Sequence, residues 1–118
     1  MIVQLITKEE LEKLINSTED YRLIDVREPE EIESYGAIPT SKNIPLGEIV
    51  NAFNLPIGEF EIKYSFSFNK DTKLIFYCRS GGRSAQASEL VSKKGCNTFN
   101  FKGSILEWSK THPEIKAY

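Results

Sequence analysis

A short segment of the sequence brings together a thiol, two glycines and two arginines at a spacing that suits nucleophilic chemistry. Cys78 ends the apolar, β-forming run KLIFYC, so we expect its thiol at the mouth of a buried strand, outside the packed core. Gly81 and Gly82 let the following loop curl around the sulfur, because glycine accepts backbone angles that other residues resist. A helix is expected to begin directly after the loop and to turn its positive end toward the sulfur. Together with the charges of Arg79 and Arg83, these features favour the thiolate, which is the nucleophilic form of cysteine.

The same loop predicts how a substrate would be held. Arg83 closes the loop, where its guanidinium could bind a sulfonate or sulfate-like group through two parallel hydrogen bonds. Arg79 is a second candidate, and the three residues between the arginines are expected to act through their backbone amides. The competing interpretation is a buried strand cysteine followed by an ordinary Gly-Gly turn. The predicted site residues are Cys78 as the catalytic nucleophile and, for substrate binding, Arg79, Ser80, Gly81, Gly82 and Arg83.

Three further residues have side chains that could act in catalysis but are interpreted as structural. Asp25 and Arg27 come at the end of another apolar run, YRLIDV, where a carboxylate and a guanidinium usually satisfy loop amides or each other. We therefore expect them to support the active loop, residues 78–84. Cys96 is expected to be a core or half-buried thiol near the start of a strand, at the opposite end from Cys78 and beyond disulfide reach.

The elements that must position these residues alternate between strands and helices. A capping box at TKEE (7–10) begins a helix, and Pro29 begins a short helix that ends before Gly36. The face of the helix after the active loop should bury Ala87, Leu90 and Val91. The predicted strands cover 21–26, 41–45, 73–78 and 97–101, and the predicted helices include 29–35, 46–53, a stretch from Pro56 to Tyr64, 84–94 and a closing helix around 105–108.

This alternation predicts an α/β fold with a parallel sheet covered on both faces by helices. Ligands of such sheets bind beyond the carboxyl ends of the strands. That rule selects the end of strand 21–26 and the end of strand 73–78, which carries Cys78.

The length, charge and composition of the chain limit the class of protein that it can be. The 118 residues allow one domain, and a formal net charge of −2 argues against nucleic acid as the main partner. No apolar run approaches the roughly 20 residues that a membrane span needs, and the amino terminus lacks the basic start of a signal peptide. The two cysteines are too few for a disulfide framework or a metal site. We therefore expect a cytoplasmic protein in a reducing environment, without a metal, a cofactor or a membrane partner.

Four segments, in order and spacing, resemble a rhodanese domain. They are LIDVREPEE (23–31), GAIPTSKNIP (36–45), CRSGGRS (78–84) and FKGSILEW (101–108), and the resemblance extends roughly from residue 20 to residue 108. In particular, the chain resembles the single-domain thiosulfate sulfurtransferases. The resemblance implies a five-stranded parallel sheet flanked by helices, a persulfide on Cys78 and a loop from Arg79 to Arg83 that cradles the sulfur.

The predicted function is therefore a sulfurtransferase. It would take sulfane sulfur from thiosulfate or a low-molecular-weight persulfide and pass it to cyanide, glutathione or a protein thiol. A cysteine-dependent phosphatase or arsenate reductase is the first alternative. Phosphatases of this type have five residues between cysteine and arginine, whereas four lie between Cys78 and Arg83. The second alternative is a non-catalytic interaction module, against which the presence of Cys78 and both arginines argues.

Overall fold

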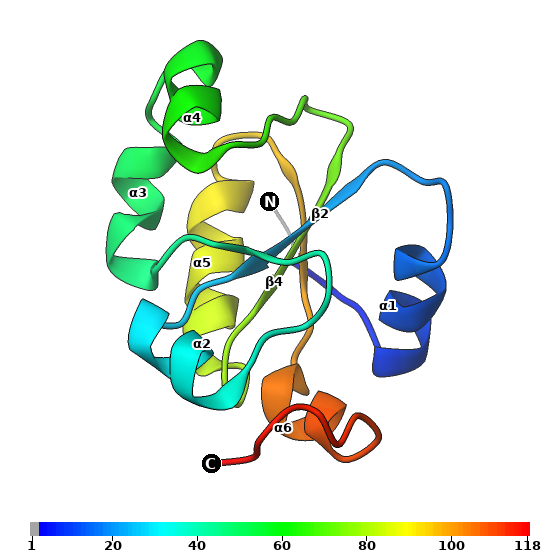
Figure 1. Ribbon diagram of the computed structural model, residues 1–118. Coiled ribbons are helices and arrows are strands. Elements are labelled where there is room, and N and C mark those ends of the chain that lie inside the picture. The colour runs from blue at the N-terminus through cyan, green and yellow to red at the C-terminus, as the bar shows by residue number, and fades with distance from the viewer. Residues whose placement is uncertain (1–2) are drawn as a thin grey trace.

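The computed structural model describes residues 3–118, and a five-stranded parallel sheet forms its centre (Figure 1). The strand order is β1-β5-β4-β2-β3, so β4 lies in the middle with a neighbour on each side. The strands are β1 (Gln4–Leu5), β2 (Tyr21–Asp25), β3 (Lys42–Asn43), β4 (Lys73–Tyr77) and β5 (Asn97–Asn100). The predicted α/β fold with a five-stranded parallel sheet is confirmed.

Five α-helices and one 3₁₀ turn connect the strands, and a sixth α-helix follows the last strand. The capping box before the first helix is formed as predicted, with Thr7 and Glu10 exchanging backbone and side-chain hydrogen bonds. The helix after the active loop begins at Gly82, two residues earlier than predicted. The elements are α1 (Lys8–Ile15), α2 (Pro29–Tyr35), η1 (Leu46–Glu48), α3 (Ile49–Ala52), α4 (Ile57–Tyr64), α5 (Gly82–Ser92) and α6 (Ser104–Ser109).

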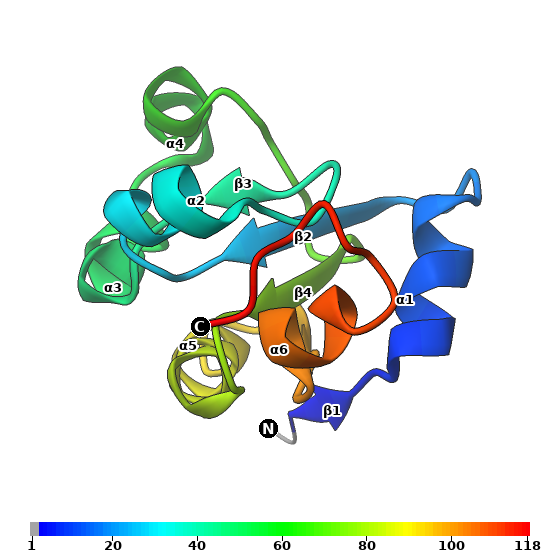
Figure 2. The same ribbon diagram turned by 60° about the horizontal axis from the view of Figure 1, so that its bottom comes forward.

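Alternate side chains of the central strand supply two separate cores. Leu74 and Phe76 point to the face covered by α3, α4 and α5, and Ile75 and Tyr77 point to the face covered by α1 and α6 (Figures 1 and 2). All four side chains are fully buried, which explains why β4 appears in the sequence as a continuous apolar run. The carboxyl ends of β2 and β4 therefore emerge side by side, with Asp25 paired to Tyr77 in the register.

Other details also differ from the sequence-based expectations. The edge strand β1 was not among the strands predicted from the pattern, and it pairs in parallel with β5. Leu90, expected on the buried face of α5, is 37% exposed, while Ala87 and Val91 are buried as expected. The weak strand predicted at 41–45 is reduced to the two residues of β3.

Among residues 3–118, no helix has both the length and the apolar character that crossing a lipid bilayer requires.

Candidate active site

Cys78 lies one residue beyond β4, but its side chain is inside the core. It is only 1% exposed and belongs to the cluster that also contains Phe76 and Ala87. The prediction of a thiol outside the packed core is therefore wrong. The reason is that the loop after β4 folds back over the sulfur before α5 begins, so the strand end is covered by its own continuation.

Hydrogen bonds directed at the sulfur make this buried thiol acidic. The backbone N–H of Gly81 donates to Cys78 Sγ over 3.1 Å, and the hydroxyl of Ser84 lies 3.5 Å from the same atom. Burial alone would raise the pKa of Cys78, but hydrogen bonds from Ser84, Gly81 and Ser80 to the thiolate outweigh it, and the pKa is lowered. The loop therefore has the acidifying effect that the sequence predicted, although the sequence analysis did not single out Ser84. Its position directly after Arg83, in the first turn of α5, was the available signal.

A second serine fixes the backbone of the nucleophile. Ser104 Oγ accepts a hydrogen bond from the backbone N–H of Cys78 over 3.0 Å and lies 3.9 Å from its Sγ. The start of α6 then contacts the loop, because Ile105 N donates to the carbonyl of Cys78 and Leu106 N to that of Arg79, over 3.0 and 3.1 Å. The segment 101–108 thus supports the active loop from a distant part of the chain.

The loop can approach the main chain of Lys102, just before α6, only because Gly81 has no side chain. Its φ of +99° lies in the left-handed region, and a Cβ there would overlap the carbonyl group of Lys102. Gly82 differs, since a Cβ at that position would meet nothing within 4 Å. Of the two glycines that the sequence analysis treated alike, one is required by the conformation of the loop.

Arg83 is paired with an acidic residue from another element. Its Nη1 and Nη2 donate to the two carboxylate oxygens of Glu31, on α2, over 2.6 and 3.0 Å. Hydrogen bonding by Arg83 lowers the pKa of Glu31 to about 2, and the same contact raises the pKa of Arg83. The guanidinium therefore lies beside the loop, as predicted, but its charge is matched by a carboxylate that the sequence analysis did not single out.

Arg79 is held by the other end of the chain. Its Nε donates to the main-chain oxygen of Tyr118, and its guanidinium carbon lies 5.0 Å from the centroid of the Tyr118 ring. Ser80 is exposed on the outer side of the loop. The six predicted site residues thus form one continuous segment, made of the loop 78–81 and the first two residues of α5, and both of its arginines are engaged by residues remote in sequence.

Asp25 and Arg27 satisfy each other at the carboxyl end of β2. Both side chains are fully buried, and Arg27 Nη2 donates to Asp25 Oδ2 over 2.7 Å. Arg27 Nη2 also donates to the carbonyl of Gly36 over 2.7 Å. Burial lowers the pKa of Arg27, but hydrogen bonding to Asp25 and Tyr118 outweighs this effect, so the side chain stays charged. The pair therefore ties the end of β2 to the segment that follows α2, as expected of a supporting role.

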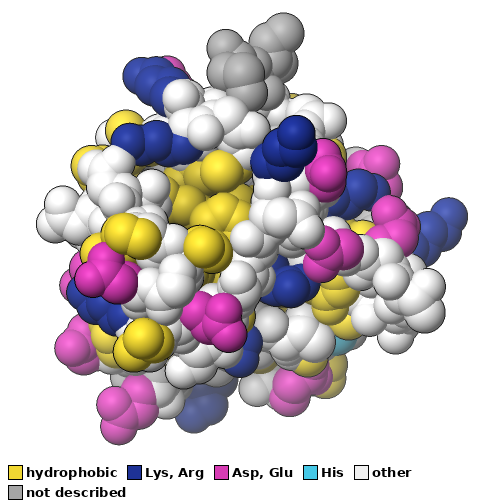
Figure 3. All heavy atoms as spheres, turned by 90° about the horizontal axis from the view of Figure 1, so that it is seen from above, with side chains coloured by type: hydrophobic (Ala, Val, Ile, Leu, Met, Phe, Trp, Pro, Cys, Tyr) yellow, Lys and Arg dark blue, Asp and Glu magenta, His cyan; other side chains and the backbone are white. Residues whose placement is uncertain are grey.

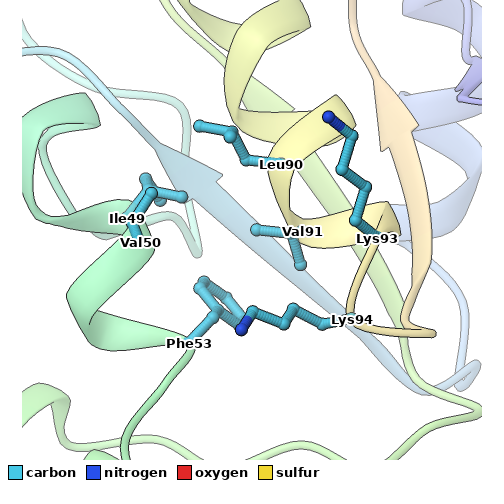
Figure 4. Close-up of a pocket in the computed structure, with 7 residues that line it drawn as sticks. All are labelled: Ile49, Val50, Phe53, Leu90, Val91, Lys93 and Lys94. Carbon is cyan, nitrogen blue, oxygen red and sulfur yellow. The ribbon is translucent and has the colours of Figure 1, made fainter.

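A pocket of about 290 Å³ lies away from the active loop. Figure 3 shows hydrophobic side chains in a hollow on the upper end of the molecule, with basic side chains nearby. The pocket residues, drawn in Figure 4, come from α3 and from the carboxyl-terminal end of α5, whereas the active loop precedes the amino-terminal end of α5. They are Ile49, Val50, Phe53, Leu90, Val91, Lys93 and Lys94. This hollow is therefore separate from the chemistry of Cys78.

Cys96 is also remote from the site. It precedes β5 at the amino-terminal end of the sheet, is partly buried and is a free thiol, as predicted. Residues 3–118 contain no group of three or more side chains arranged to hold a metal ion.

Comparison with known proteins agrees with this geometry. Residues 7–111 match the family model of the rhodanese-like domain. The chain is 48% identical over 89 residues to a Schizosaccharomyces pombe protein named putative thiosulfate sulfurtransferase, mitochondrial. The aligned region covers 74% of this chain and 62% of that protein. It is 37% identical over 90 residues to the human thiosulfate:glutathione sulfurtransferase, covering 74% of this chain and 77% of that protein.

The fold comparison leads to the same group. The solved structure of the human single-domain sulfurtransferase matches with a TM-score of 0.86 at 31% identity, covering 94% of this chain and 99% of that one. The family match spans most of the described residues and includes β4, the loop after it and α6. The family match therefore shows that this chain, which carries a thiol of lowered pKa at the end of its central strand, belongs to the rhodanese-like domain family of sulfurtransferases.

Proposed function

We propose that the chain transfers sulfane sulfur through a persulfide formed on Cys78. The observation that carries this proposal is the set of hydrogen bonds to the sulfur from Gly81 N and Ser84 Oγ, which stabilise a thiolate in a buried setting. A thiolate that is already formed needs no general base. The sulfurtransferase relatives support this assignment.

The reaction would proceed in two displacements. The Cys78 thiolate attacks the outer sulfur of the donor, a sulfur–sulfur bond forms, and the donor's own sulfur–sulfur bond breaks. With thiosulfate as donor, sulfite leaves with the bonding electron pair. An acceptor nucleophile then attacks the outer sulfur of the persulfide and Cys78 leaves again as a thiolate, so that no external oxidant or reductant is needed.

The loop amides are proposed to stabilise the persulfide as they stabilise the thiolate. The backbone amides of Ser84, Gly81 and Ser80 are directed at the sulfur, and fixed N–H donors cost little reorganisation when charge moves onto the outer sulfur. Arg79 and Arg83 are proposed to attract an anionic donor to the loop mouth. Because Glu31 already occupies the fork of Arg83, the more available cation is Arg79.

The proposed donors are thiosulfate or a small persulfide, and the proposed acceptors are cyanide, glutathione or a protein thiol. The human relative named thiosulfate:glutathione sulfurtransferase supports a small thiol in the acceptor role. Cytoplasmic location and the absence of nucleic-acid and membrane partners stay predictions, and two relatives, from Schizosaccharomyces pombe and Saccharomyces cerevisiae, are named as mitochondrial. The two free thiols support a reducing compartment.

Intact mass after incubation with thiosulfate tests the proposal. The protein should gain one sulfur atom, and subsequent cyanide should remove it. Cys78→Ser should abolish the gain while the chain still folds, because the change is nearly isosteric in its buried site. Cys96→Ser is the matched control and should gain the sulfur normally, since Cys96 lies at the opposite end of the sheet.

Two results would contradict the assignment. A sulfur gain that survives Cys78→Ser would show that another group is the nucleophile. Hydrolysis of an aryl phosphate by the unmodified protein, without any sulfur gain, would favour the phosphatase alternative.

A further inference from the structure

The segment after α6 returns across the carboxyl end of the sheet and finishes beside the active loop. Figure 2 shows it passing between α2 and α6 toward the start of α5. Ile115 anchors it, because this side chain is only 6% exposed and packs into the core on the α1 and α6 face. The backbone N–H of Lys116 then donates to the carbonyl of Tyr35 over 3.0 Å. Tyr118 is therefore held in a defined position.

Four residues around the active loop converge on the Tyr118 side chain. Its ring stacks on Tyr35, with centroids 3.8 Å apart and planes 4° from parallel. Its hydroxyl accepts a hydrogen bond from Arg27 Nη1 over 3.2 Å and donates one to Glu31 Oε2 over 2.7 Å. The fourth contact is the guanidinium of Arg79, near the ring.

Through these contacts, one residue is linked to both arginines of the loop. Arg79 donates its Nε–H directly to the main-chain oxygen of Tyr118. Arg83 is linked indirectly, because both of its Nη groups bind Glu31, which also accepts the Tyr118 hydroxyl. Both arginines that flank the loop are thus already engaged by protein atoms before a donor arrives.

We propose that Tyr118 is a specificity-determining residue that disfavours anionic sulfur donors relative to neutral ones. This inference rests on the proposed function. An anion that binds Arg79 must compete with the main-chain oxygen and the aromatic ring of Tyr118, both of which interact favourably with a guanidinium. A neutral donor does not need Arg79 and meets no such competition. Tyr118 therefore raises the KM for an anion while leaving the reactivity of the Cys78 thiolate unchanged.

Steady-state kinetics of Tyr118→Ala with two donors is the first test. The donors are thiosulfate, whose non-reacting sulfonate end is anionic, and the persulfide of 2-mercaptoethanol, which serves as the neutral donor because its non-reacting end is an uncharged hydroxyl. Loss of an exposed cation–π contact predicts a KM for thiosulfate about two- to fivefold lower, with kcat and the KM for the neutral donor unchanged. Lys116→Ala is the matched control in the same segment, because only the backbone of Lys116 makes the contact to Tyr35. A chain ending at Ile115, which keeps the core anchor, loses the main-chain oxygen of Tyr118 as well as its ring and should lower the thiosulfate KM at least as far as Tyr118→Ala.

Alkylation of Cys78 is a second test that does not depend on sulfur transfer. Iodoacetate and iodoacetamide differ mainly in charge, and a Cys96→Ser background leaves Cys78 as the single thiol. Tyr118→Ala should raise the iodoacetate rate relative to the iodoacetamide rate, again about two- to fivefold. Tyr118→Phe should resemble the parent protein, because the ring and the main-chain oxygen are retained. Thermal unfolding checks that each variant is folded.

The outcomes separate this inference from the proposed function. If the parent protein gains no sulfur from any donor but the alkylation ratio rises in Tyr118→Ala, the proposed function fails and the competition for Arg79 stands. If sulfur transfer is normal and Tyr118→Ala leaves both the ratio and the thiosulfate KM unchanged, the specificity role is wrong. A higher KM for thiosulfate in Tyr118→Ala would also overturn it, since Tyr118 would then assist anion binding.

Discussion

The two cysteines of this chain show how the pKa of the same side chain shifts in opposite directions in different surroundings. Burial raises the pKa of Cys96, and nothing nearby offsets that effect. Burial acts in the same direction on Cys78, but the hydroxyl of Ser84 and the amides of Gly81 and Ser80 donate to its thiolate and lower the pKa. The difference comes from hydrogen-bond donors and not from exposure, since Cys78 is the more deeply buried of the two.

This contrast predicts different pH profiles for the two thiols. Only the thiolate reacts with iodoacetamide, so the rate falls as the pH drops through the pKa of each group. In Cys96→Ser, which reports Cys78, the midpoint should lie below that of an ordinary thiol. In Cys78→Ser, which reports Cys96, it should lie above it. The measurement is the alkylation rate against pH by intact mass. Equal midpoints would contradict the role assigned to the loop donors.

Ser84→Ala tests the side-chain donor separately. Removing its hydroxyl should move the Cys78 profile to higher pH and lower sulfur transfer at neutral pH about two- to tenfold, because a typical hydrogen bond contributes about 0.5–1.5 kcal/mol. Ser92→Ala is the control on the same helix, since this buried hydroxyl binds the carbonyl of Glu89. A Ser92→Ala profile shifted as far as that of Ser84→Ala would point to a general disturbance of α5.

At the scale of elements, the two loop glycines should respond very differently to alanine. Gly81→Ala forces a Cβ into the Lys102 carbonyl at a φ of +99°, so the loop must move away from α6. We expect it to lose about 1–3 kcal/mol of stability and most of the sulfur transfer. Gly82→Ala has free space and lies at the start of α5, so its stability should stay within about 0.5 kcal/mol of the parent. Urea unfolding and transfer rates check both variants, and equal effects would contradict the steric argument.

The sequence was sufficient for the elements that carry a strong local pattern. The apolar run of β4 and the proline and glycine bounds of α2 are local signals, and both elements formed where predicted. The two residues of β1 are exposed and carry no alternating pattern, so their pairing with β5 depends on contacts made far along the chain. Leu90 has the spacing of a buried residue, but the hollow beside α3 leaves it partly exposed.

The candidate site also contains residues that the sequence pattern predicts and residues that it does not. The loop from Cys78 to Arg83 is contiguous, so residue types and order were enough to predict it. Glu31 and Tyr118 could not be identified from the pattern, because the contact of Glu31 with Arg83 spans 52 positions and that with Tyr118 spans 87. Such pairs arise only after the sheet has brought the carboxyl end of β2 beside that of β4.

For the molecule as a whole, the buried pair of Asp25 and Arg27 should contribute far more than a surface pair. Asp25→Asn leaves a fully buried guanidinium without its counter-charge and should cost about 3–5 kcal/mol. The matched control is Glu19→Gln, which breaks the exposed pair between Glu19 and Lys73 and should cost at most about 1 kcal/mol. The free energy of unfolding in urea checks both. A loss below about 1 kcal/mol in Asp25→Asn would show that Arg27 finds other partners.

The two edge strands of the sheet also affect how this protein behaves at high concentration. An open sheet has backbone N–H and C=O groups at its edge strands that could pair with a second molecule and start aggregation. Here the edge strands β1 and β3 are two residues long each, and Lys42 places an exposed charge on β3, which Pro45 soon follows. Each edge therefore offers too short a stretch of backbone for another strand to extend the sheet, which protects the folded chain against edge-to-edge association.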